Sequence, residues 1–259
     1  MQRIDQQESR DEGGQKEQVI RPPAKPKQTI ADHIYGSIRR DLMECRWPAG
    51  HTLKIRTLAA EFGVSAMPVR LALKRLGEEG ALTVEENRSA RVPTISQQRF
   101  SEFYEITVRL ETLALERAFQ RINADQLKRL IDRADETQLD IEAGRISGYA
   151  QRFNSILMEL YRIGGSSALI EFIEYAWVNV APPSNAVFEA PMFVSKIHAH
   201  LLEILQAFRR KDLEAAEIAL VAALSYAERA MNLLMDMEQT SKSLNQVRRP
   251  KEAASASRR

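Results

Sequence analysis

Apolar residues recur along most of this chain at the spacing of helices, and the pattern changes near residue 95. Before that point the helical stretches are short and are followed by two β-prone runs, residues 82–84 and 90–92. After it, long stretches keep the helical spacing and no alternating strand pattern occurs. These stretches are residues 97–121, 125–142, 147–163, 167–180, 192–210 and 213–238, with a loop predicted at residues 182–185. The pattern predicts a mainly α protein with a small N-terminal domain and a C-terminal antiparallel all-helical bundle of six or seven helices.

Composition divides the chain into four segments. These are a polar, Pro-punctuated tail at 1–28, a first domain at 29–95, the helical domain at 96–240, and a Ser-, Ala- and Arg-rich tail at 241–259. Both tails are expected to be disordered because they hold few large apolar residues. Thr29, Ser96 and Asp212 are placed to act as N-caps, which sets the predicted starts of the first helix, the bundle and the last helix.

Residues 58–76 carry the pattern of two short helices joined by a tight turn. Gly63 stands where the first helix must stop, and Ser65 is an expected N-cap whose hydroxyl accepts a free amide hydrogen. Pro68 falls in the first turn, where its missing N–H costs little. Val69, Leu73 and Leu76 recur at helical spacing and should face inward, leaving Arg70, Lys74 and Arg75 outside. By itself this pattern also fits an αα-hairpin with a solvated basic face.

The stretch after Gly80 favours the DNA-binding interpretation. The two β-prone runs flank polar residues 85–89 and predict a hairpin directly after the cationic helix. Arg88 at its tip and Arg91 on its flank can reach phosphate or a minor groove. A basic second helix followed by a basic hairpin predicts a winged helix-turn-helix, whose second helix lies in the major groove of DNA.

These residues carry a resemblance. LAAEFGVSAMPVRLALKRLGEEGALTV with the NRSARV hairpin resembles the winged helix of the GntR family of bacterial transcription regulators, in the branch with an all-helical effector domain called FCD. The resemblance extends over about residues 30–238. Ala66, Leu71 and Ser89 depart from the family's usual Arg, Glu and Gly, so the preferred operator need not be the family's usual one.

The resemblance implies DNA contacts by Arg56, Ser65, Arg70 and Arg88, and charge and position add further candidates. The full predicted DNA-binding set is Arg56, Ser65, Met67, Arg70, Lys74, Arg75, Asn87, Arg88 and Arg91. Family members often hold a metal ion in the bundle through an Asp and three His. Here those positions fall on Ala150, Asn154, Leu201 and Ala223. His198 and His200 are too close in sequence to share a helix face, so we expect no metal and no cofactor. A family Arg falls on Thr107, while Glu111 matches.

The bundle is expected to enclose an apolar pocket for a small-molecule effector. The candidate polar contacts are Arg109, Asn154, Tyr161, His198 and Asn232. Each also has a purely structural interpretation. Arg109 can form an ion pair, Asn154 can fill the volume of the metal-ligating side chain that it replaces, and His198 can be a core histidine with its hydrogen bonds satisfied. A closed, non-functional pocket is the other possibility.

Charge is unevenly distributed about a net value of +2. Residues 29–95 carry ten basic and eight acidic side chains, residues 96–240 carry 15 and 21, and residues 241–259 carry six and one. This fits a DNA-facing module joined to an acidic sensing module better than a wholly basic chromatin-type protein. No signal peptide and no apolar span of about 18 residues are visible, and Cys45 has no disulfide partner. We expect a cytoplasmic protein that makes no membrane contact.

The favoured hypothesis is a homodimeric, sequence-specific transcription regulator and, of the two signs of regulation that the sequence leaves open, a repressor. It would bind a palindromic operator on double-stranded DNA and be gated by a small molecule. The alternative is a constitutive or weakly specific DNA-binding protein with a closed effector pocket. An enzyme is disfavoured, because the sequence contains no Gly-rich phosphate loop, nucleophile set or paired carboxylates at catalytic spacing.

Overall fold

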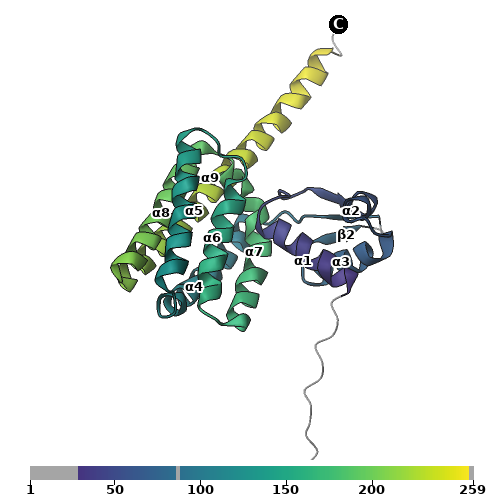
Figure 1. Cartoon of the computed structure of the whole chain (residues 1–259). Helices are drawn as coiled ribbons and strands as arrows, with labels where there is room; N and C mark the ends of the chain where they lie inside the picture. Colours follow the sequence, from purple (N-terminus) through teal and green to yellow (C-terminus); the bar gives the residue numbers. More distant parts are fainter. Residues whose placement is uncertain (1–28, 86–87, 257–259) are drawn as a thin grey trace, which may run out of the picture.

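The computed structural model describes residues 29–85 and 88–256, with side chains described as far as residue 241. A small N-terminal domain lies beside a larger helical bundle, and the end of the last helix extends beyond the bundle (Figure 1). This agrees with the predicted fold class. The predicted tail at 1–28 lies outside the described residues.

The N-terminal domain contains three helices and a three-stranded antiparallel sheet. In chain order its elements are α1 (Ile30–Met43), β1 (Thr52–Lys54), α2 (Ile55–Phe62), α3 (Ala66–Glu78), β2 (Thr83–Glu85) and β3 (Ser89–Arg91). β3 lies in the centre, with Leu53 and Val84 paired to Ala90 from either side. The hairpin after Gly80 is therefore present, and the αα-hairpin alternative is wrong. β1 was not predicted from the sequence.

Local signals fix the helices of this domain. Thr29 and Asp32 form a reciprocal capping box at the start of α1. Gly63 ends α2 in the left-handed conformation, with φ at 64°, as a tight stop requires. The apolar face of α1 packs against the inward face of α3, and both faces are almost completely buried. The residues involved are Ile34, Ile38, Leu42, Val69, Leu73 and Leu76.

The described residues of the C-terminal domain form helices joined by short turns, without a strand. Its elements are α4 (Gln97–Phe119), α5 (Ala124–Glu142), α6 (Tyr149–Ile163), α7 (Ser167–Phe188), α8 (Pro191–Arg210) and α9 (Leu213–Ala256). Ser96 caps α4 by accepting the Arg99 amide, and Asp212 caps α9 by accepting the Ala215 amide, as predicted. α4, α7 and α8 all pack against α9.

Two predictions about this domain are wrong. The loop expected at residues 182–185 is part of α7, which runs through Pro182 and Pro183. Both prolines are buried, so packing of this segment outweighs the loss of two backbone donors, and the Ser184 hydroxyl donates to the Val180 carbonyl within the same turn. The last helix, expected to end near residue 238, instead continues to Ala256, into the segment that was expected to be a disordered tail.

One described helix segment, Leu213–Ser241 within α9, is long and apolar enough to cross a membrane by length and composition. No such span was expected from the sequence. The same helix packs against α4, α7 and α8, and 33% of its apolar window is buried, so its length and composition are weak evidence for a membrane span.

Candidate DNA-binding surface and effector cavity

The outward face of α3 is basic and exposed, as predicted. Val69 and Leu73 point into the core, and helical periodicity therefore turns Arg70 and Lys74 to the outside, where both are exposed. Lys74 Nζ lies 3.6 Å from Glu78 Oε1, a surface contact of small energetic weight. Arg70 has no ion-pair partner in the described part of the chain. Its guanidinium is available to a ligand outside the protein.

The N-terminal end of α3 is also open. Ser65 is the N-cap residue by backbone conformation, but its side chain makes no capping hydrogen bond. The hydroxyl cap predicted for Ser65 is thus wrong, and the exposed hydroxyl is left free. Met67, in the first turn of α3, is 61% exposed. The end of a helix that presents free amide groups is a suitable contact for phosphate.

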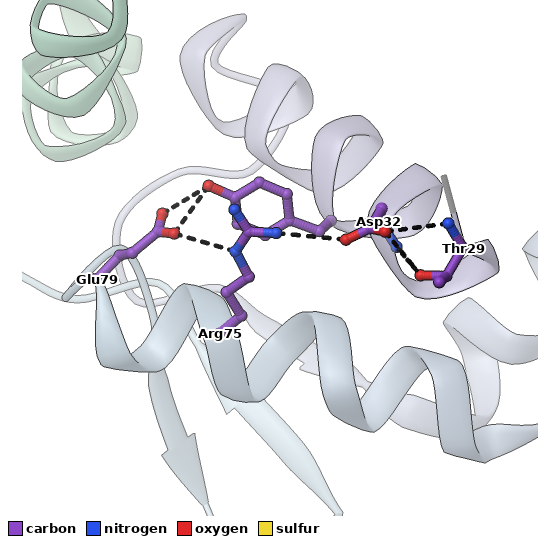
Figure 2. Close-up of polar contacts among 5 residues, drawn as sticks. Thr29, Asp32, Arg75 and Glu79 are labelled. Atoms are coloured by element: carbon purple, nitrogen blue, oxygen red, sulfur yellow. Dashed lines mark hydrogen bonds and ion pairs between the residues drawn. The ribbon is translucent and has the colours of Figure 1, made fainter. Parts of the chain in front are cut away.

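Arg75 has partners within its own domain. Figure 2 shows its side chain between the carboxylates of Asp32 on α1 and Glu79 at the end of α3, at 3.4 Å from each. The guanidinium carbon lies 3.8 Å from the centre of the Tyr35 ring, whose hydroxyl donates to Glu79. Burial, followed by the bond to Glu79, raises the pKa of Tyr35 to about 12. Arg75 therefore joins α1 to α3, a role that sequence reasoning missed.

The hairpin carries two arginines, and only one of them has an ion-pair partner among the described residues. Arg88 is exposed at the turn, and no ion pair involving it occurs among the described residues. Arg91 on β3 pairs with Glu85 on β2 at 2.8 Å, across the hairpin. Arg56 is exposed in the first turn of α2. Asn87, also predicted to contact DNA, lies outside the described residues.

A cavity of about 50 Å³ lies inside the bundle, among α4, α6, α7, α8 and α9. Its wall is mostly apolar. The aliphatic and aromatic side chains include Phe153, Leu157, Val180, Phe188, Ile197, Ile204, Leu220 and Leu224. The polar part of the wall comes mainly from one face of α4, with Tyr104, Thr107 and Glu111.

Glu111 is the centre of a buried hydrogen-bond cluster in that wall. Its carboxylate accepts the Tyr161 hydroxyl at 2.7 Å and the Trp177 indole N–H at 2.5 Å. The side chain is 1% exposed, and burial raises the pKa of Glu111 to about 7, although the two hydrogen bonds act in the opposite direction. The cluster ties α4 to α6 and α7 beside the cavity.

Family models match both domains. The model described as "Bacterial regulatory proteins, gntR family" covers residues 30–92, and the model of the FCD domain covers residues 102–226. The chain belongs to the GntR family. It is a DNA-binding transcriptional regulator with an FCD domain, a class of regulators rather than enzymes.

Relatives agree with this assignment. The HTH-type transcriptional regulator McbR of Escherichia coli (strain K12) is 27% identical over 168 residues, which are 64% of this chain and 76% of McbR. The transcriptional repressor RspR of the same organism is 24% identical over 195 residues, which are 75% of this chain and 86% of RspR. A solved structure of E. coli McbR/YncC has the same fold, with a TM-score of 0.74 and 22% identity over 80% of this chain and 99% of that one.

The positions at which FCD domains often ligate a metal ion do not fit one in this GntR-family protein. Ala150, Leu201 and Ala223 are buried but offer no ligand atom. Asn154 directs its amide away to the Met43 carbonyl, at 2.7 Å. No group of three His, Cys, Asp or Glu side chains able to hold a metal occurs within the described residues.

Only part of the predicted effector set lies at the cavity of the FCD domain. Asn154 lines it, and Tyr161 reaches it through its bond to Glu111. Arg109 is exposed and lines an outer groove between α4 and α9. It lies on the side of α4 opposite to Glu111, since two residues along a helix turn the side chain by about 200°.

The other two candidates do not line the cavity. His198 is fully buried, and its Nε2 donates to the Ala134 carbonyl at 2.9 Å, so it is a satisfied core histidine on that side. Asn232 has a buried Oδ1 without a hydrogen-bond partner in the described structure, and it does not line the cavity. Sequence reasoning missed Tyr104, Thr107 and Glu111 as wall residues. Their spacing of three and four is the signal that places them on one helix face.

Two residues of the cavity wall also form hydrogen bonds with the DNA-binding domain. Asn154 and Ala181 line the cavity, and each bonds to the end of α1: Asn154 to the Met43 carbonyl, and the Ala181 carbonyl to the Cys45 thiol, at 3.0 Å. Cys45 is buried, and burial raises the pKa of its thiol, so it is protonated and able to donate. A displacement of Asn154 or Ala181 at the cavity wall would therefore act directly on the end of α1.

The raised pKa of Glu111 predicts a pH-dependent stability. Because the folded protein holds this proton more tightly than the unfolded chain, the free energy of unfolding should fall as pH rises from about 4.5 to about 7, and then level off. The shift in the pKa of Glu111 corresponds to a decrease of about 3 kcal/mol in the free energy of unfolding over this range, and Glu111→Gln should abolish that decrease. Urea unfolding of both proteins between pH 5 and 8 measures it. Parallel pH profiles for the two proteins would contradict the prediction.

Proposed function

We propose that this GntR-family protein is a dimeric transcriptional repressor that binds a palindromic operator in the cytoplasm and responds to a small molecule in the bundle cavity. The observation that carries the proposal is the exposed face of α3, on which Arg70 has no partner of its own chain, followed at once by the hairpin with Arg88. The relative RspR is a transcriptional repressor, which supports repression as the sign of regulation. No metal ion takes part in this proposal.

Dimerisation is supported by an exposed apolar face on α4 and α9. It consists of Ile106, Leu113, Ile218 and Val221, between 39% and 63% exposed, and is called the α4–α9 face below. Leu113, Ile218 and Val221 line the same groove. Single exposed apolar residues are ordinary, but a group on adjacent helices is a typical contact for a partner.

Charges beside the α4–α9 face favour a second copy of the chain as that partner. Arg109 and Arg229 line the groove and have no ion-pair partner within the described side chains. Glu116 and Glu217 line it too, and burial and neighbouring acids raise the pKa of Glu217. In a two-fold symmetric pair, the arginines of one copy can meet the acids of the other. Because α4 follows the hairpin after a short linker, this pairing also brings two copies of α3 into one assembly.

DNase footprinting of the DNA upstream of the protein's own gene tests the proposal. Two protected half-sites related by symmetry, about one helical turn apart, are expected for a dimer that reads the major groove. DNA binding whose affinity depends on salt concentration but shows no preference for a palindrome would instead indicate a nonspecific architectural protein.

A further inference from the structure

Three polar residues form a row on the inward face of α4. Tyr104, Thr107 and Glu111 are spaced by three and four positions, and all three line the cavity. Each is more than nine-tenths buried. The Thr107 hydroxyl has no hydrogen-bond partner among the described atoms, although it lies one turn from Glu111. A buried hydroxyl without a partner is uncommon and costly, so it marks a place where a ligand atom belongs.

The cavity also lacks a positive charge. No Lys, Arg or His side chain belongs to its described wall, and both bonds to the Glu111 carboxylate come from neutral donors, Tyr161 and Trp177. A carboxylate buried among neutral groups is stabilised by a cation placed beside it and destabilised by a second anion. Most ligands with a carboxylate or phosphate group are therefore poor matches for this cavity.

The rest of the wall limits the size of the ligand and requires that most of its surface be apolar. Leu157, Val180, Ile197, Ile204 and Leu220 supply aliphatic surface, and the volume of about 50 Å³ admits only a compact group unless the wall moves. An apolar body of this size would exclude water from the polar row. It would also lie against Asn154 and Ala181, the wall residues that bond to the end of α1.

We propose that the effector is a compact organic amine, whose ammonium group pairs with Glu111 and donates a hydrogen bond to Thr107 while its alkyl body fills the aliphatic part of the cavity. This assignment rests on the proposed function, in which the cavity is the effector site. The wall has two unsatisfied features, a carboxylate without a nearby positive charge and a hydroxyl without a hydrogen-bond partner. A single ammonium group would supply a partner to both.

Three ligands of the same branched skeleton test the head group: isobutylamine, isobutanol and isobutyrate. Each is titrated calorimetrically into the full-length protein at pH 8. Isobutylamine should bind at least tenfold more tightly than isobutanol, and isobutyrate should give no binding. The affinity for the amine should rise from pH 6 to pH 8, because Glu111 ionises in this range while the amine stays protonated. Of the groups that face Glu111, burial keeps Tyr161 and Tyr104 neutral there, since it raises both pKa values.

Two nearly isosteric variants separate recognition from folding. Glu111→Gln should reduce the amine affinity at least tenfold and abolish its pH dependence. Thr107→Val should weaken amine binding without loss of thermal stability, because the hydroxyl it removes makes no bond within the protein. Equal or tighter binding of isobutanol or isobutyrate, or amine binding that Glu111→Gln leaves unchanged, would overturn the proposal.

The same protein samples distinguish this inference from the proposed function. Operator binding without ligand is measured separately by footprinting. If the footprint fails while the amine binds through Glu111, the regulator model is wrong and the ligand assignment stands. If the footprint is found and the amine does not bind, the ligand assignment is wrong.

Discussion

Replacing Arg70 with alanine is expected to abolish specific operator binding while leaving the protein folded. Arg70 is exposed on α3, one residue after the buried Val69, and has no ion-pair partner in the described chain. A side chain that reads a base edge contributes about 1–3 kcal/mol, and a dimer loses it twice. The expected loss is therefore about 30-fold at the least, measured by gel-shift titration on the footprinted operator and on a scrambled duplex.

Arg75→Met is the matched control for this experiment. It removes a positive charge from the same helix, but from a guanidinium that already contacts Asp32, Glu79 and the Tyr35 ring. We expect a lower melting temperature, since α1 and α3 lose a shared contact, and only a few-fold change in operator affinity. Normal operator binding by Arg70→Ala, or a larger loss of operator binding from Arg75→Met than from Arg70→Ala, would contradict the assignment of the recognition surface.

Leu113→Glu is expected to convert the proposed dimer into monomers and, with that, to weaken operator binding by about 100-fold or more. Leu113 lies in the α4–α9 face, where a two-fold axis would bring the new carboxylate close to its own copy and to Glu116 and Glu217. Specific affinity depends on engaging both half-sites together, so a monomer keeps only one set of contacts. Sedimentation velocity at micromolar concentration gives the oligomeric state.

Leu139→Glu provides the comparison for this variant. Leu139 on α5 is 63% exposed and lies outside the α4–α9 face, so the same substitution there should leave both mass and operator affinity unchanged. If Leu113→Glu remains dimeric while it folds normally, the α4–α9 face is not the dimer interface.

The recognition helix was predictable because its determinants are local. Gly63 stops one helix, and the spacing of Val69, Leu73 and Leu76 fixes which side of the next is buried. That spacing also fixes that Arg70 points outward. The helical path of Pro182 was not predictable, because local propensity opposes it and only burial between other helices explains it.

The cavity in the bundle was harder to predict because its wall comes from distant segments of the chain. Glu111 meets Tyr161 and Trp177 across 50 and 66 residues of sequence, and nothing local indicates those partners. Arg109 was an attractive candidate by residue type alone, but its register on α4 places it on the outside.

The bonds from the cavity wall to the end of α1 restrict how the two domains can move. The chain itself connects them only once, between β3 and α4. Asn154 and Ala181 add a second attachment through Met43 and Cys45, and the Arg39–Glu174 ion pair adds a third. A rigid body fixed at several separated points cannot pivot about its covalent connection alone. Any reorientation of the winged helix must first release α1, so the hinge of this molecule is non-covalent and lies beside the cavity of the bundle.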